Sequence, residues 1–183
     1  MNKAVILTAR KERDSQVPYP LLPFAGDTCL MDRTLAILRE NGIKQIAIVT
    51  GFCHEQFEKY KADDVTLIYN KEYEFTASMG SLALAKDFID EDFLLVEGDT
   101  FYEKKVIEKL CELKAGNCIS MTEESGSGDE CFVETKNGFV TKITKDRHRV
   151  CNFEGEMLGA TRISYETYQK LIYLWERSTN PYL

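Results

Sequence analysis

Two carboxylates, Glu97 and Asp99, are separated by a single glycine at the end of a short apolar stretch. Residues 93–97 show no polar alternation, which is typical of a buried strand in a parallel sheet. Ligands of open α/β sheets bind beyond the carboxyl ends of such strands. Paired carboxylates there suit Mg²⁺, which takes one or two protein carboxylates and completes its shell with water and substrate phosphates. The alternative is a strand end that carries two solvated acids.

A charged loop, residues 8–15, follows an apolar strand predicted at residues 4–7. The first loop of an α/β sheet is a common place for nucleotide phosphates. This loop contains no glycine, but it carries Arg10, Lys11 and Arg13, whose side chains could hold phosphate by charge. A solvated charged loop without a ligand is the alternative.

Two further segments could contact a ligand. Residues 76–81 open a predicted helix with small and hydroxyl-bearing side chains, so a flat base could approach Gly80 and Ser81; an ordinary capped helix start explains them nearly as well. Residues 125–131 form a Ser/Gly/acid loop beside a predicted hairpin. With the nearby Lys145, this loop and its Glu130 could cover a second substrate, the acceptor.

Strands and helices are predicted to alternate along most of the chain, which indicates a parallel sheet covered by helices on both faces. Asn137-Gly138 between two β-rich runs predicts a hairpin, and the three prolines of residues 18–24 predict an extended path. Thr28 is the expected N-cap of the first helix. The predicted strands are residues 4–7, 46–50, 66–70, 93–97, 117–121, 131–134, 139–142 and 155–163, and the predicted helices are residues 30–41, 54–61, 78–86, 103–113 and 165–176.

The composition indicates a soluble domain. The chain has 183 residues, 44% hydrophobic and 29% charged, which fits one domain with its own core. Its formal net charge of −7 argues against nucleic acid or an anionic membrane as a partner. The six cysteines lack CxxC spacing and there are two histidines, so free thiols in a reducing cytoplasm are expected rather than a zinc site. No signal peptide or apolar run near the ~20 residues of a membrane span is evident.

The order of these segments resembles the nucleoside-triphosphate transferase (nucleotidyltransferase) family. Within that family the chain is most similar to the bacterial phosphocholine and 2-aminoethylphosphonate cytidylyltransferases. The resemblance extends over nearly all of residues 3–175 in one unbroken order. The stretches that carry it are residues 5–9, 18–24, 30–35, 46–52, 67–70, 78–82 and 97–99.

The resemblance implies a Rossmann-like, mixed and mostly parallel sheet of the nucleotide-diphospho-sugar transferase type, with a small β-hairpin added. It implies transfer of CMP from CTP to phosphocholine or an aminophosphonate, with release of pyrophosphate and with Mg²⁺ held partly by Asp99. Arg10, Arg13 and Asp99 are then the expected catalytic residues, and Glu130 and Lys145 the expected acceptor contacts. The expected nucleotide contacts are Thr8, Ala9, Arg10, Lys11, Tyr19, Gly80 and Ser81.

The chain departs from the family pattern at three places. Arg10 and Glu12 occupy positions that are glycines in the family loop, and Tyr19 replaces a phosphate-binding lysine. The second metal-binding carboxylate of the family is expected beyond the last residue. The 183 residues are therefore interpreted as one domain, truncated at its C-terminus or the N-terminal part of a longer protein that could include an aminotransferase.

Two other functions stay open: a catalytically degenerate nucleotide-binding or regulatory domain, and a glycosyltransferase that uses Glu97 and Asp99 on a sugar nucleotide. The sequence specifies no oligomeric state.

Overall fold

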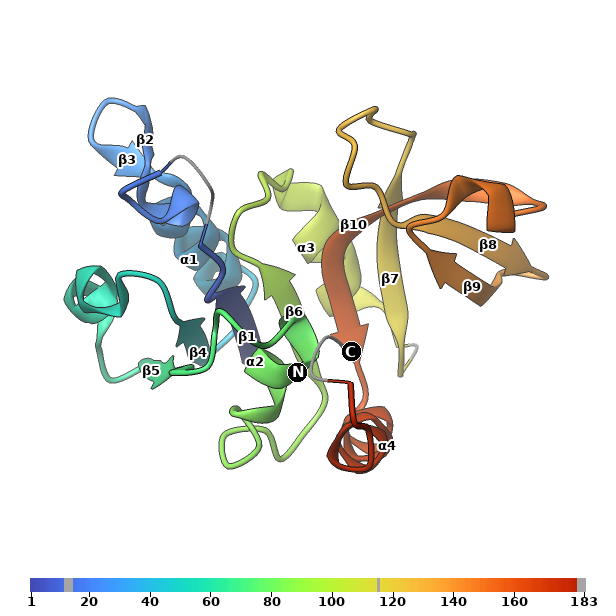
Figure 1. The fold of residues 1–183 in the computed structure, drawn as a ribbon. Coiled ribbons are helices and arrows are strands. Elements are labelled where there is room, and N and C mark those ends of the chain that lie inside the picture. The colour runs from blue at the N-terminus through green and yellow to red at the C-terminus, as the bar shows by residue number, and fades with distance from the viewer. Residues whose placement is uncertain (12–14, 115, 181–183) are drawn as a thin grey trace.

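A twisted eight-stranded sheet forms the centre of the computed structural model, which describes residues 1–11, 15–114 and 116–180 (Figure 1). The strands follow the order β5-β4-β1-β6-β10-β8-β9, and β7 pairs with the other edge of β10. A separate small hairpin contains β2 (Pro23–Ala25) and β3 (Thr28–Cys29). The predicted Rossmann-like, mixed and mostly parallel sheet is confirmed.

Four neighbouring strands are parallel and build the core of the sheet. They are β1 (Lys3–Thr8), β4 (Gln45–Thr50), β5 (Val65–Tyr69) and β6 (Phe93–Glu97). The β1 strand lies between β4 and β6, so its backbone groups are paired on both sides. Its carboxyl end therefore lies beside Glu97, the last residue of β6.

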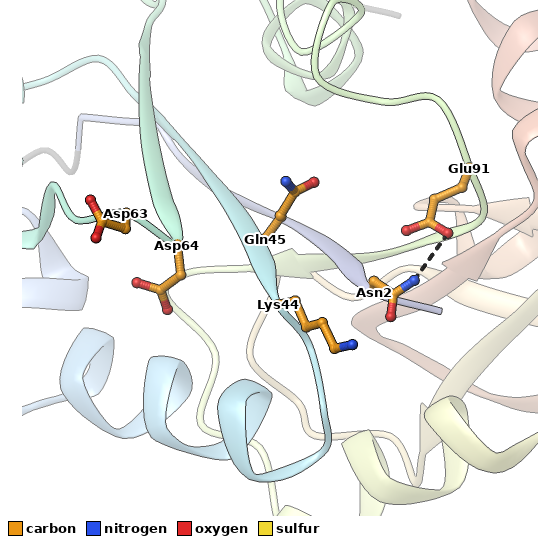
Figure 2. Close-up of a pocket in the computed structure, with 6 residues that line it drawn as sticks. All are labelled: Asn2, Lys44, Gln45, Asp63, Asp64 and Glu91. Carbon is orange, nitrogen blue, oxygen red and sulfur yellow. Dashed lines mark hydrogen bonds between the residues drawn. The ribbon is translucent and has the colours of Figure 1, made fainter.

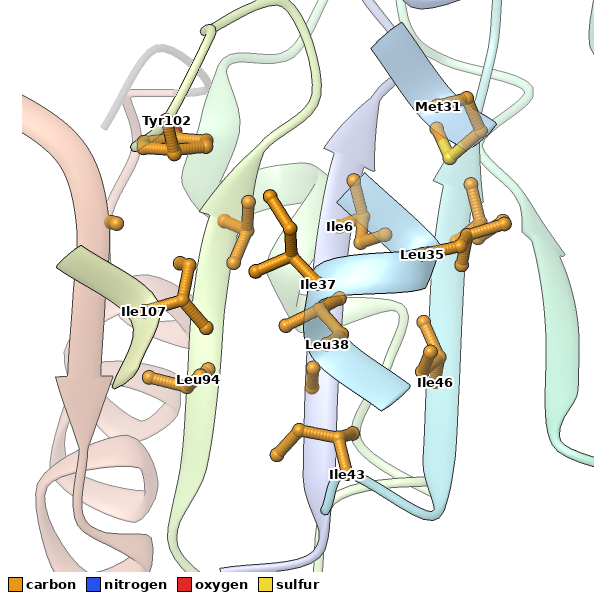
Figure 3. Close-up of a cluster of buried hydrophobic side chains, with 14 of the residues drawn as sticks. Ile6, Met31, Leu35, Ile37, Leu38, Ile43, Ile46, Leu94, Tyr102 and Ile107 are labelled. Atoms are coloured by element: carbon orange, nitrogen blue, oxygen red, sulfur yellow. The ribbon is translucent and has the colours of Figure 1, made fainter. Parts of the chain in front are cut away.

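Helices cover both faces of this sheet, as the apolar strands predicted. Helices α1 (Leu30–Glu40) and α3 (Lys104–Glu112) pack on one face, and α2 (Ser78–Ala83) and α4 (Tyr165–Glu176) on the other. In β1, Ala4 and Ile6 face the first pair of helices while Val5 faces the second, which is the period of two expected for a strand. Figure 3 shows Leu35, Leu38 and Ile107 directed from the helices toward Ile6, Ile46 and Leu94 of the strands.

The C-terminal half adds antiparallel strands to the parallel core. The long β10 (Phe153–Ile163) pairs with β6 through its last residues, and with β7 (Cys118–Thr122) and β8 (Phe132–Lys136). The edge strand β9 (Phe139–Thr144) completes the predicted hairpin with β8. Asn137 and Gly138 both have positive φ, 54° and 78°, as a two-residue type I′ turn requires.

Three local predictions are wrong, and a fourth, the short helix at residues 54–61, is confirmed with a 3-10 geometry. The short helix predicted at residues 54–61 is present as the 3-10 helix η2 (His54–Tyr60), in which Phe57 is the buried side chain. The predicted helix 78–86 ends as an α-helix at Ala83. The helix cap is Cys29, whose N–H donates to the Asp32 carboxylate at 3.0 Å, and not Thr28. The proline-rich segment contains the turn η1 (Tyr19–Leu21) before β2. The remaining short helix, η3, spans Arg147–Arg149.

Two general features bear on the earlier expectations. All six cysteines are free thiols. In the part of the chain that the structure describes, no helix is long and apolar enough to cross a membrane.

Candidate functional site

A pocket of about 930 Å³ opens at the carboxyl ends of β1 and β6. Its volume falls in the range of ligand-binding pockets, and its place is where open α/β sheets bind ligands. Four parts of the chain meet there: the first loop, the segment leading into α2, the turn after β6, and the C-terminal half. The lining residues are Leu7, Ala9, Arg10, Lys11, Tyr19, Tyr73, Glu74, Thr76, Ala77, Ser78, Ser81, Glu97, Asp99, Thr100, Ser127, Asp129, Cys131, Lys145 and residues 156–159.

A second hollow lies at the opposite, amino-terminal edge of the parallel strands (Figure 2). Its volume is about 540 Å³, and it is lined by Asn2, Lys44, Gln45, Asp63, Asp64 and Glu91. It is more open than the first pocket, and the Asn2 amide donates to Glu91 at 3.4 Å across its rim. Because ligands of parallel sheets bind at the carboxyl ends of the strands, the pocket beside Glu97 is the candidate site.

The turn after β6 presents Glu97 and Asp99 to the pocket, and its backbone is tightly fixed. Gly98 donates its N–H to the Leu7 carbonyl at 2.9 Å. A Cβ at Gly98 would lie 2.4 Å from the Thr8 methyl group, so a side chain does not fit there. The buried Tyr102 donates its hydroxyl to the Glu97 carbonyl at 3.1 Å from the far side of the turn.

The carboxylate of Glu97 is affected by burial and by its neighbour Asp99. Glu97 reaches solvent through the pocket but is surrounded by protein, and this burial together with the charge of Asp99 raises the pKa of Glu97. A divalent cation would relieve that repulsion. The described residues contain no group of three or more His, Cys, Asp or Glu side chains placed to hold a metal. The donor set fits Mg²⁺ through two carboxylate oxygens, because this ion commonly takes its other ligands from water and phosphate.

Gly159 shapes the floor beneath Glu97. It lies where the pairing of β10 with β7 shifts register between Met157 and Thr161, and its φ is +76°. A Cβ at this position would lie 2.7 Å from a carboxylate oxygen of Glu97. The irregular glycine position therefore leaves the space that the Glu97 carboxylate occupies.

Cationic side chains enter the pocket from two walls. Arg10 follows β1 and Lys145 follows β9, and both contact the carboxylate of Asp129. The hydrogen bond from Lys145 holds the pKa of Asp129 below its usual range, with a smaller contribution from Arg10. Asp129 in turn raises the pKa of Lys145, so this lysine stays charged.

A buried hydrogen-bond network positions the start of α2. The Asn70 amide donates to the hydroxyls of Thr76 and Ser81, both at 3.0 Å, and its oxygen accepts from the Glu72 N–H at 2.9 Å. Ser81 is 5% exposed but lines the pocket. Since its oxygen accepts from Asn70, its own O–H is the donor that it can offer to a ligand.

The structure brings most of the sequence-predicted site residues to one pocket. Ala9, Arg10, Lys11, Tyr19, Ser81, Asp99 and Lys145 all line it. Their functional roles stay predictions. Arg13 lies outside the described residues.

Three residues that were predicted to contact a ligand are not among the residues that line the pocket. Thr8 is buried and donates its hydroxyl to the Val49 carbonyl at 3.0 Å. Gly80 is buried against Thr76, where a Cβ would lie 2.7 Å from the Thr76 Cβ. Glu130 is directed back into its own loop and accepts from the Gly128 N–H at 3.1 Å. Thr8 and Gly80 are therefore buried beside pocket residues, and none of the three lines the pocket itself.

Asp129 and Gly159 are pocket residues that the sequence reading did not single out. Asp129 is one acid in a Ser/Gly/acid loop, and its two cationic partners are 119 and 16 residues away along the chain. No local pattern reveals such a contact. Gly159 did carry a signal, since an isolated glycine inside a predicted strand often marks a bulge.

The sequence model of the MobA-like NTP transferase domain matches residues 4–157 of the chain. The chain belongs to this family. The match includes the first loop, Glu97, Asp99 and the β8–β9 hairpin, so the pocket of this NTP transferase domain is built almost entirely from the matched part.

Curated relatives of this NTP transferase domain include two proteins named for cytidylyl transfer. One is choline-phosphate cytidylyltransferase of Haemophilus influenzae, 42% identical over 77 residues, which covers 42% of this chain and 33% of the relative. The other is CMP-5′-(3-aminopropyl)phosphonate synthase of Streptomyces rubellomurinus, 29% identical over 163 residues, which covers 83% of this chain and 26% of the relative. The chain thus spans about a third or less of the length of these two relatives.

Solved structures share the fold. The inositol-1-phosphate CTP transferase from T. maritima superposes with a TM-score of 0.76 at 18% identity, covering 92% of this chain and 73% of that one. The CTP:phosphocholine cytidylyltransferase from Streptococcus pneumoniae gives a TM-score of 0.72 at 19% identity, covering 96% and 76%. At these identities the likeness establishes the fold.

Proposed function

We propose that the protein transfers CMP from CTP to phosphocholine or a related aminophosphonate and releases pyrophosphate. The observation that carries the proposal is the convergence of the first loop, the start of α2 and the Glu97–Asp99 turn on one pocket in a chain of the NTP transferase family. The names of the two curated relatives support CTP as the donor and a small phosphorylated or phosphonate compound as the acceptor.

The donor nucleotide is proposed to lie between the first loop and α2. Arg10 and Lys11 line the pocket and are proposed to pair with its phosphates, since an arginine can hold two phosphate oxygens at once. The Ser81 hydroxyl and the backbone around Ser78 line the opposite wall, where the base is proposed to lie. Catalysis would depend on positioning and charge neutralisation, without a covalent enzyme intermediate.

Glu97 and Asp99 are the proposed holders of Mg²⁺. When bound, the ion would neutralise the phosphate charge and help orient the transferred group. The carboxylates of the pocket support this proposal. Without a bound cation, the negative charges of Glu97 and Asp99 would repel a triphosphate. The acceptor is proposed to enter from the side of Lys145.

A pyrophosphate-release assay tests the proposed reaction. The chain is incubated with CTP and Mg²⁺, together with phosphocholine, 2-aminoethylphosphonate or no acceptor. Release that requires both an acceptor and Mg²⁺ supports the proposal. If CTP yields no pyrophosphate with any aminophosphate or aminophosphonate, the proposed activity is wrong.

Substitution of Gly159 by alanine should reduce this turnover by about 10- to 100-fold, because the new methyl group displaces the Glu97 carboxylate. Gly138→Ala is the matched control. Gly138 also has a positive φ, +78°, but a Cβ there meets no atom within 4 Å. Both variants should lose about 1–2 kcal/mol of unfolding free energy from the left-handed backbone. Equal turnover in the two variants would show that the contact with Glu97 is irrelevant.

A further inference from the structure

Asp129 joins two cations of the pocket that come from different parts of the chain. Its Oδ1 lies 2.5 Å from the Lys145 ammonium, and its Oδ2 lies 3.4 Å from the Arg10 guanidinium. Arg10 follows β1, Lys145 follows β9, and Asp129 lies in the loop between β7 and β8. One carboxylate therefore contacts two cations from different elements through its two oxygens.

This arrangement has the form of an anion-binding position that is already filled. A phosphoryl or phosphonyl group presents several oxygens around one centre, and each can accept from a different cation. The side chains of Arg10, Lys145 and Asp129 remain more than half exposed, so these contacts can exchange with an incoming ligand. Ion pairs this exposed contribute little individually and can be replaced at small cost.

The charges along the pocket wall indicate what must happen when an anionic ligand enters. The described wall carries three basic side chains, Arg10, Lys11 and Lys145, and five acidic ones, Glu74, Glu97, Asp99, Asp129 and Glu156. Two of the three cations are thus engaged by Asp129. An anion that binds Arg10 and Lys145 together therefore competes with Asp129 for them.

We propose that Asp129 is an internal competitor that holds Arg10 and Lys145 and is displaced by the phosphoryl or phosphonyl group of a ligand. Asp129 thereby sets the affinity of the pocket for such groups. A group with two negative charges replaces the single charge of the carboxylate with a gain in attraction, so the ligands that displace Asp129 best are phosphate monoesters and phosphonates. The identity of this ligand class rests on the proposed function; the competition itself rests on the contacts of Asp129.

Calorimetric titration of the Asp129→Asn variant tests the proposal. The probes are inorganic phosphate, phosphocholine, and CTP with Mg²⁺, each titrated into the unmodified chain and the variant. The amide is close in size to the carboxylate but cannot compete as an anion, so at least one probe should bind about fivefold or more tightly to the variant. The probe that gains most identifies whether a donor or an acceptor phosphate displaces Asp129.

Glu124→Gln is the matched control, because Glu124 lies exposed in the same loop and is not among the described residues of the pocket wall. It should leave all three affinities unchanged, and Asp129→Ser should reproduce the gain of Asp129→Asn. Thermal melting confirms that each variant folds. Unchanged or weaker binding to both Asp129 variants, an equal gain in Glu124→Gln, or no binding of any probe overturns the proposal.

The titration separates this proposal from the proposed function. If Asp129→Asn binds phosphate more tightly but the unmodified chain releases no pyrophosphate, the competition is supported and the transferase activity is contradicted. If the unmodified chain releases pyrophosphate but substitution of Asp129 leaves the affinities unchanged, the transferase activity is supported and the competition is contradicted.

Discussion

Asp99→Asn should lower acceptor-dependent pyrophosphate release by at least about 100-fold. The amide keeps the shape of the side chain but loses the charge that attracts Mg²⁺. Asp99 lines the pocket at the end of the turn that Gly98 and Tyr102 fix, so its backbone should not move. Steady-state kinetics at several Mg²⁺ concentrations measures the effect.

The control for Asp99 is Asp63→Asn. Asp63 is an exposed carboxylate in the hollow at the opposite edge of the sheet, so its substitution changes the net charge equally and leaves the candidate site intact. Its kinetics should match those of the unmodified chain. A full rate for Asp99→Asn at limiting Mg²⁺ would remove Asp99 from the proposed metal site.

Arg10→Ala should lower the same rate by about 10²- to 10³-fold, because one charged contact to the transferred phosphates contributes about 2–4 kcal/mol in a site of this kind. Arg10→Lys should recover part of the rate, since lysine retains the charge but cannot hold two oxygens in a fixed geometry. The comparison of kcat with KM for CTP shows whether the contact forms mainly in the transition state or already in the bound substrate.

Lys44→Ala is the control for Arg10, since Lys44 lies in the hollow at the amino-terminal edge of the strands. It removes a positive charge without touching the candidate site, and its rate should be unchanged. If Arg10→Ala and Lys44→Ala behaved alike, Arg10 would have no role in binding phosphate.

The layered part of the fold could be predicted from the sequence, because the apolar pattern of a strand indicates which of its faces are buried. In β1, Ala4, Val5 and Ile6 are all buried, on alternating faces, and an uninterrupted apolar run is what a strand covered on both sides requires. The Asn137-Gly138 turn was equally readable, since few residue pairs adopt two successive positive φ angles. The type of a short helix could not be predicted in the same way. In η2 Phe57 is the one buried side chain, and this pattern does not distinguish a 3-10 helix from an α-helix.

The sequence predicted which segments form the candidate site, but not which side chains contact one another within it. Strand ends predicted where Arg10 and Asp99 would lie, because the carboxyl ends of parallel strands meet at one edge. The role of Thr8 in bonding Val49 could not be predicted, since it depends on which strand lies beside β1. The bridge from Arg10 to Asp129 spans 119 residues and joins two irregular loops, and no periodicity specifies such a pair.

The fate of the α-phosphate of CTP tests the central claim most directly. CTP carrying a phosphorus label at the α position is incubated with the chain, Mg²⁺ and either phosphocholine or 2-aminoethylphosphonate, and the labelled products are separated. The proposed reaction predicts that the label appears in a single new compound that joins CMP to the acceptor, in amounts equal to the pyrophosphate released. Label that stays in CTP, or appears only as free CMP whether or not an acceptor is present, would contradict it.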